Sequence, residues 1–246
     1  MNLPRLIILG SANAVPKVGQ DNAHLLIEGK EKIVMVDCGD NPVKVIEAGF
    51  SILDVTDLVL THFHADHVGS LPLLIMGMWL EKRTTPLVIH GLKVTLDKSI
   101  QLLELFGWNE WPNMFPVEFN IIDAEGADGF ITDSGMRISA LPVLHLVPTI
   151  GIRVESEQGR VIAYSCDTEP CPNVLRLADG ADVLLQESAG LAKGHTSPEQ
   201  AGEIASSAGV SKLVLIHYDN RVAESELLGA AREKFSGEVL LAKDMM

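Results

Sequence analysis

The chain has 246 residues, and 33 Asp and Glu against 19 Lys and Arg give it a formal net charge of −14. Hydrophobic residues make up 47% and charged residues 21%, a globular balance that excludes a disordered chain, a collagen-like fibre and a coiled coil. The length suits one large domain or two small ones. The longest apolar stretch, residues 71–80, is only ten residues long. A membrane helix needs about 20 residues, so no membrane span is predicted.

The number of cysteines and the net charge of the chain indicate its compartment and the kinds of partner it can bind. Cys38, Cys166 and Cys171 are too few for a disulfide scaffold, and their odd number favours a reducing compartment. We therefore expect a cytoplasmic protein. The chain is acidic and has no cluster of Lys and Arg, which phosphate backbones require. Nucleic acid is accordingly not expected as a partner.

Taken in chain order, apolar periodicity and turn residues predict alternating strands and helices. Strands are expected at residues 6–9, 23–28, 32–37, 58–60, 87–90, 137–143, 149–155, 161–165, 183–185, 213–216 and 239–241, and helices at 43–48, 71–82, 94–105 and 198–207. Most strands come as hairpins, with helices between them. This mixture predicts an α+β protein with packed sheets and outer helices, in preference to one doubly wound parallel sheet.

The segment THFHADH, residues 61–67, concentrates three histidines and one aspartate after a predicted buried strand. His62 and His64 are two residues apart, so in an extended chain they point to the same side. Asp66 and His67 follow as the chain turns toward its next helix, so they can face a second centre. Imidazole and carboxylate are ligands that Zn, Mn and Fe prefer. The segment therefore predicts a metal site in preference to a solvated polar loop.

One loop cannot complete the coordination of two metals, and three further candidates follow other predicted strands. His145 comes after residues 137–143, Asp167 after 161–165 and His217 after 213–216. Taken alone, a histidine in such a place is more often packed or hydrogen-bonded than metal-binding. Taken with the first loop, the three residues favour a shared metal centre.

These ordered motifs resemble those of the metallo-β-lactamase superfamily, nearest its RNase Z-like and phosphodiesterase branch. The likeness runs from the loop Gly10–Pro16, through Asp37-Cys38-Gly39 and the metal motifs, to the ending Leu240–Met246. It covers essentially the whole chain and so implies a single domain, residues 1–246. The resemblance also implies a four-layer αββα sandwich with the metal site at one edge.

The same resemblance implies two divalent metal ions, with Zn expected first and Mn or Fe also compatible. By that analogy His62, His64 and His145 hold the first metal, Asp66, His67 and His217 hold the second, and Asp167 bridges both. Carboxylate chemistry agrees, because two oxygens can span cations about 3.5–4 Å apart. Two such cations lower the pKa of a shared water, and the expected nucleophile is a metal-bridged hydroxide.

Further residues are candidates for roles around the metals. Asp37 matches the aspartate that supports the metal histidines in this superfamily, although an Asx turn with Gly39 would also explain it. The segment from His195 to Ala201 resembles the RNase Z-like loop in which a histidine approaches the substrate phosphate. Glu187 could orient His195 to protonate a leaving oxygen. Alternatively, His195 is incidental to a helix-capping loop. The candidate catalytic residues are therefore Asp66, His195 and Glu187.

Two divalent cations, the carboxylates of Asp66 and Asp167 and one hydroxide leave a local charge of about +1. Because this charge favours an anionic substrate, the expected function is hydrolysis of a small anionic phosphodiester. Only 21 residues separate His145 from Asp167, whereas tRNA-processing members of the superfamily generally insert a long arm there. A tRNA 3′-processing endoribonuclease of the RNase Z type is therefore an alternative. So are a thioester, lactone or β-lactam hydrolase and a non-catalytic metal-binding accessory protein. Homodimers are frequent among the relatives that the chain resembles.

Overall fold

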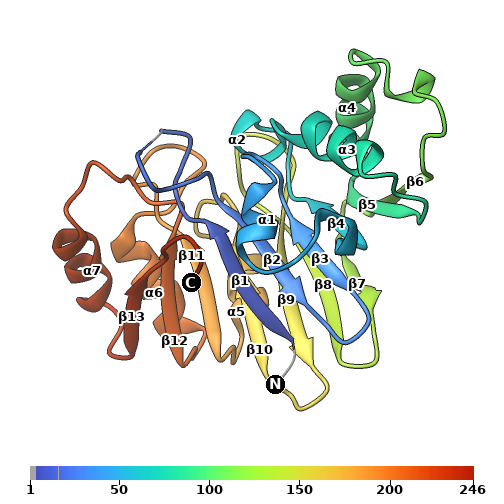
Figure 1. Cartoon of the computed structure of the whole chain (residues 1–246). Helices are drawn as coiled ribbons and strands as arrows, with labels where there is room; N and C mark the ends of the chain where they lie inside the picture. The colour runs from blue at the N-terminus through green and yellow to red at the C-terminus, as the bar shows by residue number, and fades with distance from the viewer. Residues whose placement is uncertain (1–3, 16) are drawn as a thin grey trace.

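Residues 4–15 and 17–246 are described by the computed structural model, in which two mixed sheets pack face to face (Figure 1). Pro16 of the predicted opening loop lies outside the described residues. The strands of the first sheet, in spatial order, are β1 (Arg5–Gly10), β2 (His24–Glu28), β3 (Ile33–Val36), β4 (Asp57–Leu60), β5 (Leu87–Leu92) and β6 (Val117–Ile122). The second sheet has the order β13 (Glu238–Leu241), β12 (Lys212–Ile216), β11 (Val183–Glu187), β10 (Val161–Tyr164), β9 (Thr149–Ser156), β8 (Met136–Val143) and β7 (Ala127–Thr132).

Helices cover the outer faces of both sheets (Figure 1). The first sheet carries α1 (Val43–Glu47), α3 (Leu71–Leu80) and α4 (Lys93–Glu104), with the single turn α2 (Ala65–Val68) at its edge. The second sheet carries α5 (Pro172–Ala178), α6 (Pro198–Ser207) and α7 (Glu224–Arg232). Two short 3₁₀ helices, η1 (Ile52–Asp54) and η2 (Trp108–Glu110), complete the elements.

Four layers form because successive side chains of each strand point to opposite faces of its sheet. Leu25 and Ile27 of β2 point into the core between the sheets, whereas Leu26 points into the core beneath the helices of the first sheet. A third core lies between the second sheet and α5, α6 and α7. The predicted α+β class and the αββα sandwich are confirmed.

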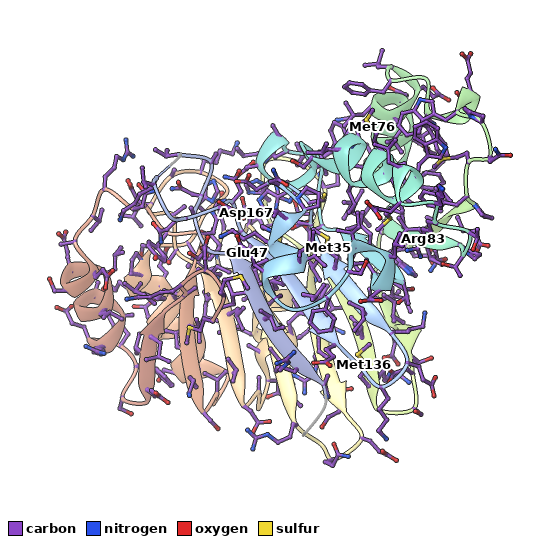
Figure 2. The ribbon with its side chains drawn as sticks, in the orientation of Figure 1. Met35, Glu47, Met76, Arg83, Met136 and Asp167 are labelled. Atoms are coloured by element: carbon purple, nitrogen blue, oxygen red, sulfur yellow. The ribbon has the colours of Figure 1, made fainter. Side chains whose placement is uncertain are left out.

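Strand direction places the site. Strands β3 to β6 run parallel to one another, and so do β10 to β13. The carboxyl ends within each set therefore reach one edge of their sheet, where the connecting loops gather. Figure 2 shows Asp167 near that edge, whereas Met136 of the inter-sheet core lies toward the opposite one.

Most predicted elements appear within a residue or two of their expected bounds, including both hairpins and α6. Strands β6 and β7 and helices α5 and α7 were not predicted from the sequence, and α2 was expected to be a turn. Across residues 4–15 and 17–246, none of the helices combines the length and apolar character that crossing a membrane requires.

Candidate metal centre

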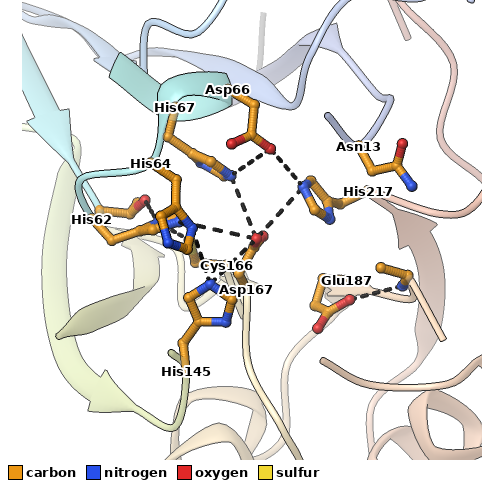
Figure 3. Close-up of polar contacts among 12 residues, drawn as sticks. Asn13, His62, His64, Asp66, His67, His145, Cys166, Asp167, Glu187 and His217 are labelled. Carbon is orange, nitrogen blue, oxygen red and sulfur yellow. Dashed lines mark hydrogen bonds and ion pairs between the residues drawn. The ribbon is translucent and has the colours of Figure 1, made fainter. Parts of the chain in front are cut away.

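The predicted ligands meet at one edge of the sandwich, although they come from four separate segments (Figure 3). Strand β4 of the first sheet leads directly into His62 and His64, and the turn α2 presents Asp66 and His67. From the second sheet, His145 follows β8, Asp167 follows β10 and His217 follows β12. The structure thus brings together all seven residues that the sequence analysis singled out as ligands.

Three histidine nitrogens form the first cluster. His62 Nε2 lies 3.0 Å from His64 Nδ1, which lies 3.2 Å from His145 Nε2. Nitrogen atoms bound tetrahedrally to one Zn²⁺ stand roughly 3.3 Å apart, so this spacing fits a shared cation. Burial lowers the pKa of His62 well below its usual range and also lowers the pKa of His145. Burial thus favours the neutral form of both rings, which is the form that binds metal.

A second cluster combines nitrogen and oxygen atoms. Asp66 Oδ2 lies 3.3 Å from His217 Nε2 and 3.7 Å from His67 Nε2. His67 is fully buried, and among the described residues its Nε2 has no hydrogen-bond partner. A buried imidazole nitrogen left without a partner is costly, and a cation between these three side chains would satisfy it.

Asp167 joins the two clusters. Its Oδ2 lies 3.5 Å from His217 Nε2 and 3.6 Å from His67 Nε2, and it lies 4.0 and 3.9 Å from His62 Nε2 and His145 Nε2. Burial alone would raise the pKa of this carboxyl, but His217 and His67 hold it well below its usual range. One ionised oxygen therefore faces both groups of ligands, so the residues present fit a pair of divalent cations.

Asp37 anchors the centre from below. Its Oδ2 accepts a 2.8 Å hydrogen bond from His67 Nδ1, which leaves His67 Nε2 directed at the cluster. Its Oδ1 accepts from the backbone nitrogen of Thr61 at 2.8 Å, and the Thr61 hydroxyl contacts both carboxylate oxygens. Thr61 was not predicted to take part in the site. Its only signal is a hydroxyl residue between the buried strand and the first histidine.

Glu187 and His195 also meet as the sequence analysis proposed. His195 Nδ1 lies 3.2 Å from Glu187 Oε1, and this hydrogen bond raises the pKa of His195. The ring of His195 lies 5.0 Å from that of His145 and 5.8 Å from that of His217, measured between centroids. The hydrogen bond to Glu187 thus favours the protonated form of a histidine that stands beside the proposed metal ligands. Ser197 caps α6 separately, and His195 takes no part in that cap.

Comparison with known proteins places this chain in a family. The sequence model of the family described as Anti-Pycsar protein Apyc1 matches residues 4–237. The chain belongs to this family. A ribonuclease Z of Methanothermobacter thermautotrophicus is 28% identical to this Apyc1-family chain over 279 residues, which cover 92% of this chain and 91% of the relative.

Solved structures show the same fold as the Apyc1-family chain. The metallo-beta-lactamase fold protein YhfI from Bacillus subtilis has a TM-score of 0.84 at 20% identity, covering 98% of this chain and 96% of its own. Human tRNase Z, short form, has a TM-score of 0.77 at 21% identity, covering 98% of this chain and 97% of its own. The predicted resemblance to the metallo-β-lactamase superfamily and its RNase Z-like branch is confirmed.

The Apyc1-family chain is accordingly a metal-dependent hydrolase with clusters of His and Asp that could hold metal ions. One expectation is weakened. The relative is named as a ribonuclease, which stands partly against the inference from acidity that nucleic acid is not a partner. The physical reason is that net charge describes the whole surface, whereas a substrate meets the local field of the site.

Proposed function

We propose that the protein hydrolyses a small anionic phosphodiester at a pair of divalent cations, with Zn expected first and Mn or Fe as alternatives. The observation that carries the proposal is the position of Asp167 Oδ2, which faces histidines of both clusters within 4.0 Å. His62, His64 and His145 would hold one cation, and Asp66, His67 and His217 the other. Asp167 would bridge them.

At such a site, paired divalent cations supply an activated water and neutralise charge that develops on phosphate. The protein's own side chains supply the remaining chemistry. Asp37 fixes the ring of His67 through the 2.8 Å bond to Nδ1. The bond to Glu187 raises the pKa of His195, so that His195 in its protonated form would donate a proton to the leaving oxygen. Asp66, whose Oδ2 lies 3.3 Å from His217 Nε2, would take part in the reaction as a ligand of the second cation.

A tRNA-processing endoribonuclease is the second candidate, and the relatives named ribonuclease Z favour it. Against it stands the short connection between the clusters. Between His145 and Asp167 the chain forms only the hairpin of β9 and β10, so no long arm is inserted there. We therefore place the small diester first.

The test measures hydrolysis of bis(p-nitrophenyl) phosphate by protein stripped with a chelator and reloaded separately with Zn or Mn. We expect turnover that disappears on chelation and returns with metal. Asp167→Ala should abolish turnover and lower the metal content. The matched control is Asp97→Ala, because Asp97 lies exposed on α4 and pairs only with Lys93 among the described residues. Circular dichroism would verify that both variants fold.

Other outcomes discriminate between the alternatives. Full activity in Asp167→Ala would contradict the assigned site. A metal-loaded protein that cleaves precursor tRNA but none of a panel of acyclic and cyclic small diesters would establish the ribonuclease. Turnover of a lactone or thioester in place of diesters would change the bond cleaved. A fully metal-loaded protein inert on every class would favour an accessory role.

A further inference from the structure

The loop between β11 and α6 is anchored near both ends, where the backbone nitrogen of Ser188 donates to the carbonyl of Ile216 and the Thr196 hydroxyl donates to the carbonyl of Thr168. Between these anchors, Gly194 holds the loop beside the metal centre.

Among the described residues, three hydrogen bonds join residues 190–195 to parts of the chain outside the loop, and two of them involve Gly194. The third joins His195 to Glu187. Leu191 in the same loop is 82% exposed. The path of residues 190–195 between the two anchors therefore depends on what Gly194 and His195 contact.

The backbone N–H and the backbone carbonyl of Gly194 each bond to a different side chain. Its backbone nitrogen donates a 2.7 Å hydrogen bond to Glu169 Oε1. Its carbonyl oxygen accepts a 2.6 Å hydrogen bond from His145 Nδ1. Because a carbonyl only accepts, the proton of His145 must reside on Nδ1, and Nε2 is left with its lone pair toward the first cluster.

Only a glycine fits this position. Gly194 has φ +86°, and a Cβ atom there would lie 2.9 Å from His145 Nδ1. Glu169 is placed by the backbone next to the same histidine, because its nitrogen donates to the carbonyl of Leu144 at 2.7 Å. Glu169 thus bonds through its backbone to Leu144, which precedes His145 in the chain, and through its carboxylate to Gly194, which accepts the hydrogen bond of the His145 ring.

We propose that Glu169 is a positioning residue, whose carboxylate tethers Gly194 and thereby fixes the orientation of His145 and the closed path of the loop that carries His195. The proposal rests on the proposed function for the roles of His145 and His195. The tether itself is a property of the fold. The sequence gives Glu169 no distinguishing signal beyond its place two residues after Asp167.

A useful consequence lies in the peptide bond between Lys193 and Gly194. Lys193 is exposed, and the nitrogen of this bond is the atom that Glu169 holds. Trypsin cleaves after lysine only where the chain can open into its active site. Cleavage at Lys193, giving residues 1–193 and 194–246, therefore reports directly on the tether without any substrate or metal.

The experiment compares Glu169→Ala with Glu169→Gln, since a glutamine oxygen can still accept the bond from Gly194. We expect trypsin to cleave Glu169→Ala after Lys193 roughly tenfold faster or more, and Glu169→Gln at nearly the wild-type rate. The second readout is the visible spectrum of the Co²⁺-loaded protein, which depends on ligand number and geometry. Glu169→Ala should change it and weaken metal binding about 10- to 100-fold, and Glu169→Gln should restore both.

The matched control is Glu157→Ala. Glu157 lies in the turn between β9 and β10, and its exposed carboxylate pairs with Lys30. If Glu169→Ala does not fold, Glu169→Asp withdraws the carboxylate by one methylene and serves the same test. Wild-type cleavage and spectrum in Glu169→Ala would overturn the proposal. So would faster cleavage with an unchanged spectrum, or a Gln variant that behaves like the Ala variant. Failure of the wild-type protein to hydrolyse diesters would overturn the proposed function and leave these readouts intact.

Discussion

Asp37 illustrates how one buried carboxylate serves both the backbone and the proposed metal site. It is completely buried, has φ +63°, and accepts hydrogen bonds from Thr61 and His67. Asp37→Ala would remove the acceptor of three buried donors, the Thr61 backbone nitrogen, the Thr61 hydroxyl and His67 Nδ1, and would place alanine in the left-handed region. We expect a loss of about 3 kcal/mol or more in the free energy of unfolding. Metal affinity should fall about 10- to 100-fold.

The matched variant is Asp37→Asn, because asparagine tolerates positive φ and retains one acceptor oxygen. It should lose clearly less stability than Asp37→Ala. Urea denaturation and metal titration of both variants would measure the difference. Equal losses in the two variants would show that the hydrogen bonds of Asp37 do not matter as proposed.

The sequence predicted which ligand candidates meet in the folded protein, but it did not predict all of the residues that hold them in place. His145, Asp167 and His217 were recognisable because each is a polar residue where a buried strand ends. Thr61 and Glu169 were not, because their roles consist of hydrogen bonds to Asp37 and to the backbone of Gly194. Contacts with backbone atoms of a distant loop leave no pattern in the residue types, so only the folded structure identifies them.

Among the elements, the short turn α2 is positioned by close contact with the loop after β3. Cys38 donates from its backbone nitrogen to the carbonyl of His67 at 2.7 Å, and a Cβ on Gly39 would lie 1.6 Å from the carbonyl oxygen of Asp66. Gly39→Ala must therefore displace the turn that carries Asp66 and His67. We expect a loss of about 1–3 kcal/mol in the free energy of unfolding, together with weaker metal binding.

Gly229→Ala makes the same change in the interior of α7, where no atom lies within 4 Å of the added Cβ. It should stabilise the protein by about 0.5–1 kcal/mol, because alanine loses less backbone entropy in a helix. Urea midpoints of the two variants should thus shift in opposite directions. A Gly39→Ala protein with the wild-type midpoint and metal affinity would contradict the proposed contact.

The elements that the sequence analysis missed share weak local signals. Strands β6 and β7 lie at the edges of their sheets, and β7 contains Asp128 and Gly129, which are rare in strands. Each strand forms by pairing with one neighbour, since β6 hydrogen-bonds to β5 and β7 hydrogen-bonds to β8. By contrast, β4 and β12 are buried on both faces, so their continuous apolar runs were evident from the sequence.

For the whole molecule, acid stability should depend on Asp57, which links three parts of the first sheet. Asp57 is 1% exposed, and its carboxylate accepts from Lys32 Nζ at 2.8 Å and from His90 Nε2 at 2.9 Å. Asn120 of β6 in turn donates to His90 Nδ1 at 2.9 Å. Burial alone would raise the pKa of Asp57, but the hydrogen bonds from His90 and Lys32 lower it from 3.8 to about 2.

Because the pKa of Asp57 is lower in the folded than in the unfolded chain, its contribution is complete above about pH 4 and is lost as the pH falls toward about 2. A shift of this size corresponds to about 2 kcal/mol. Asp57→Asn should therefore reduce the free energy of unfolding at pH 7 by roughly that amount, and the difference from wild type should shrink below about pH 4. Urea unfolding of both metal-free proteins across this range would measure the difference. Since the comparison is between two proteins at each pH, carboxylates common to both cancel, and a difference that stays constant down to pH 2 would exclude Asp57 as the titrating group.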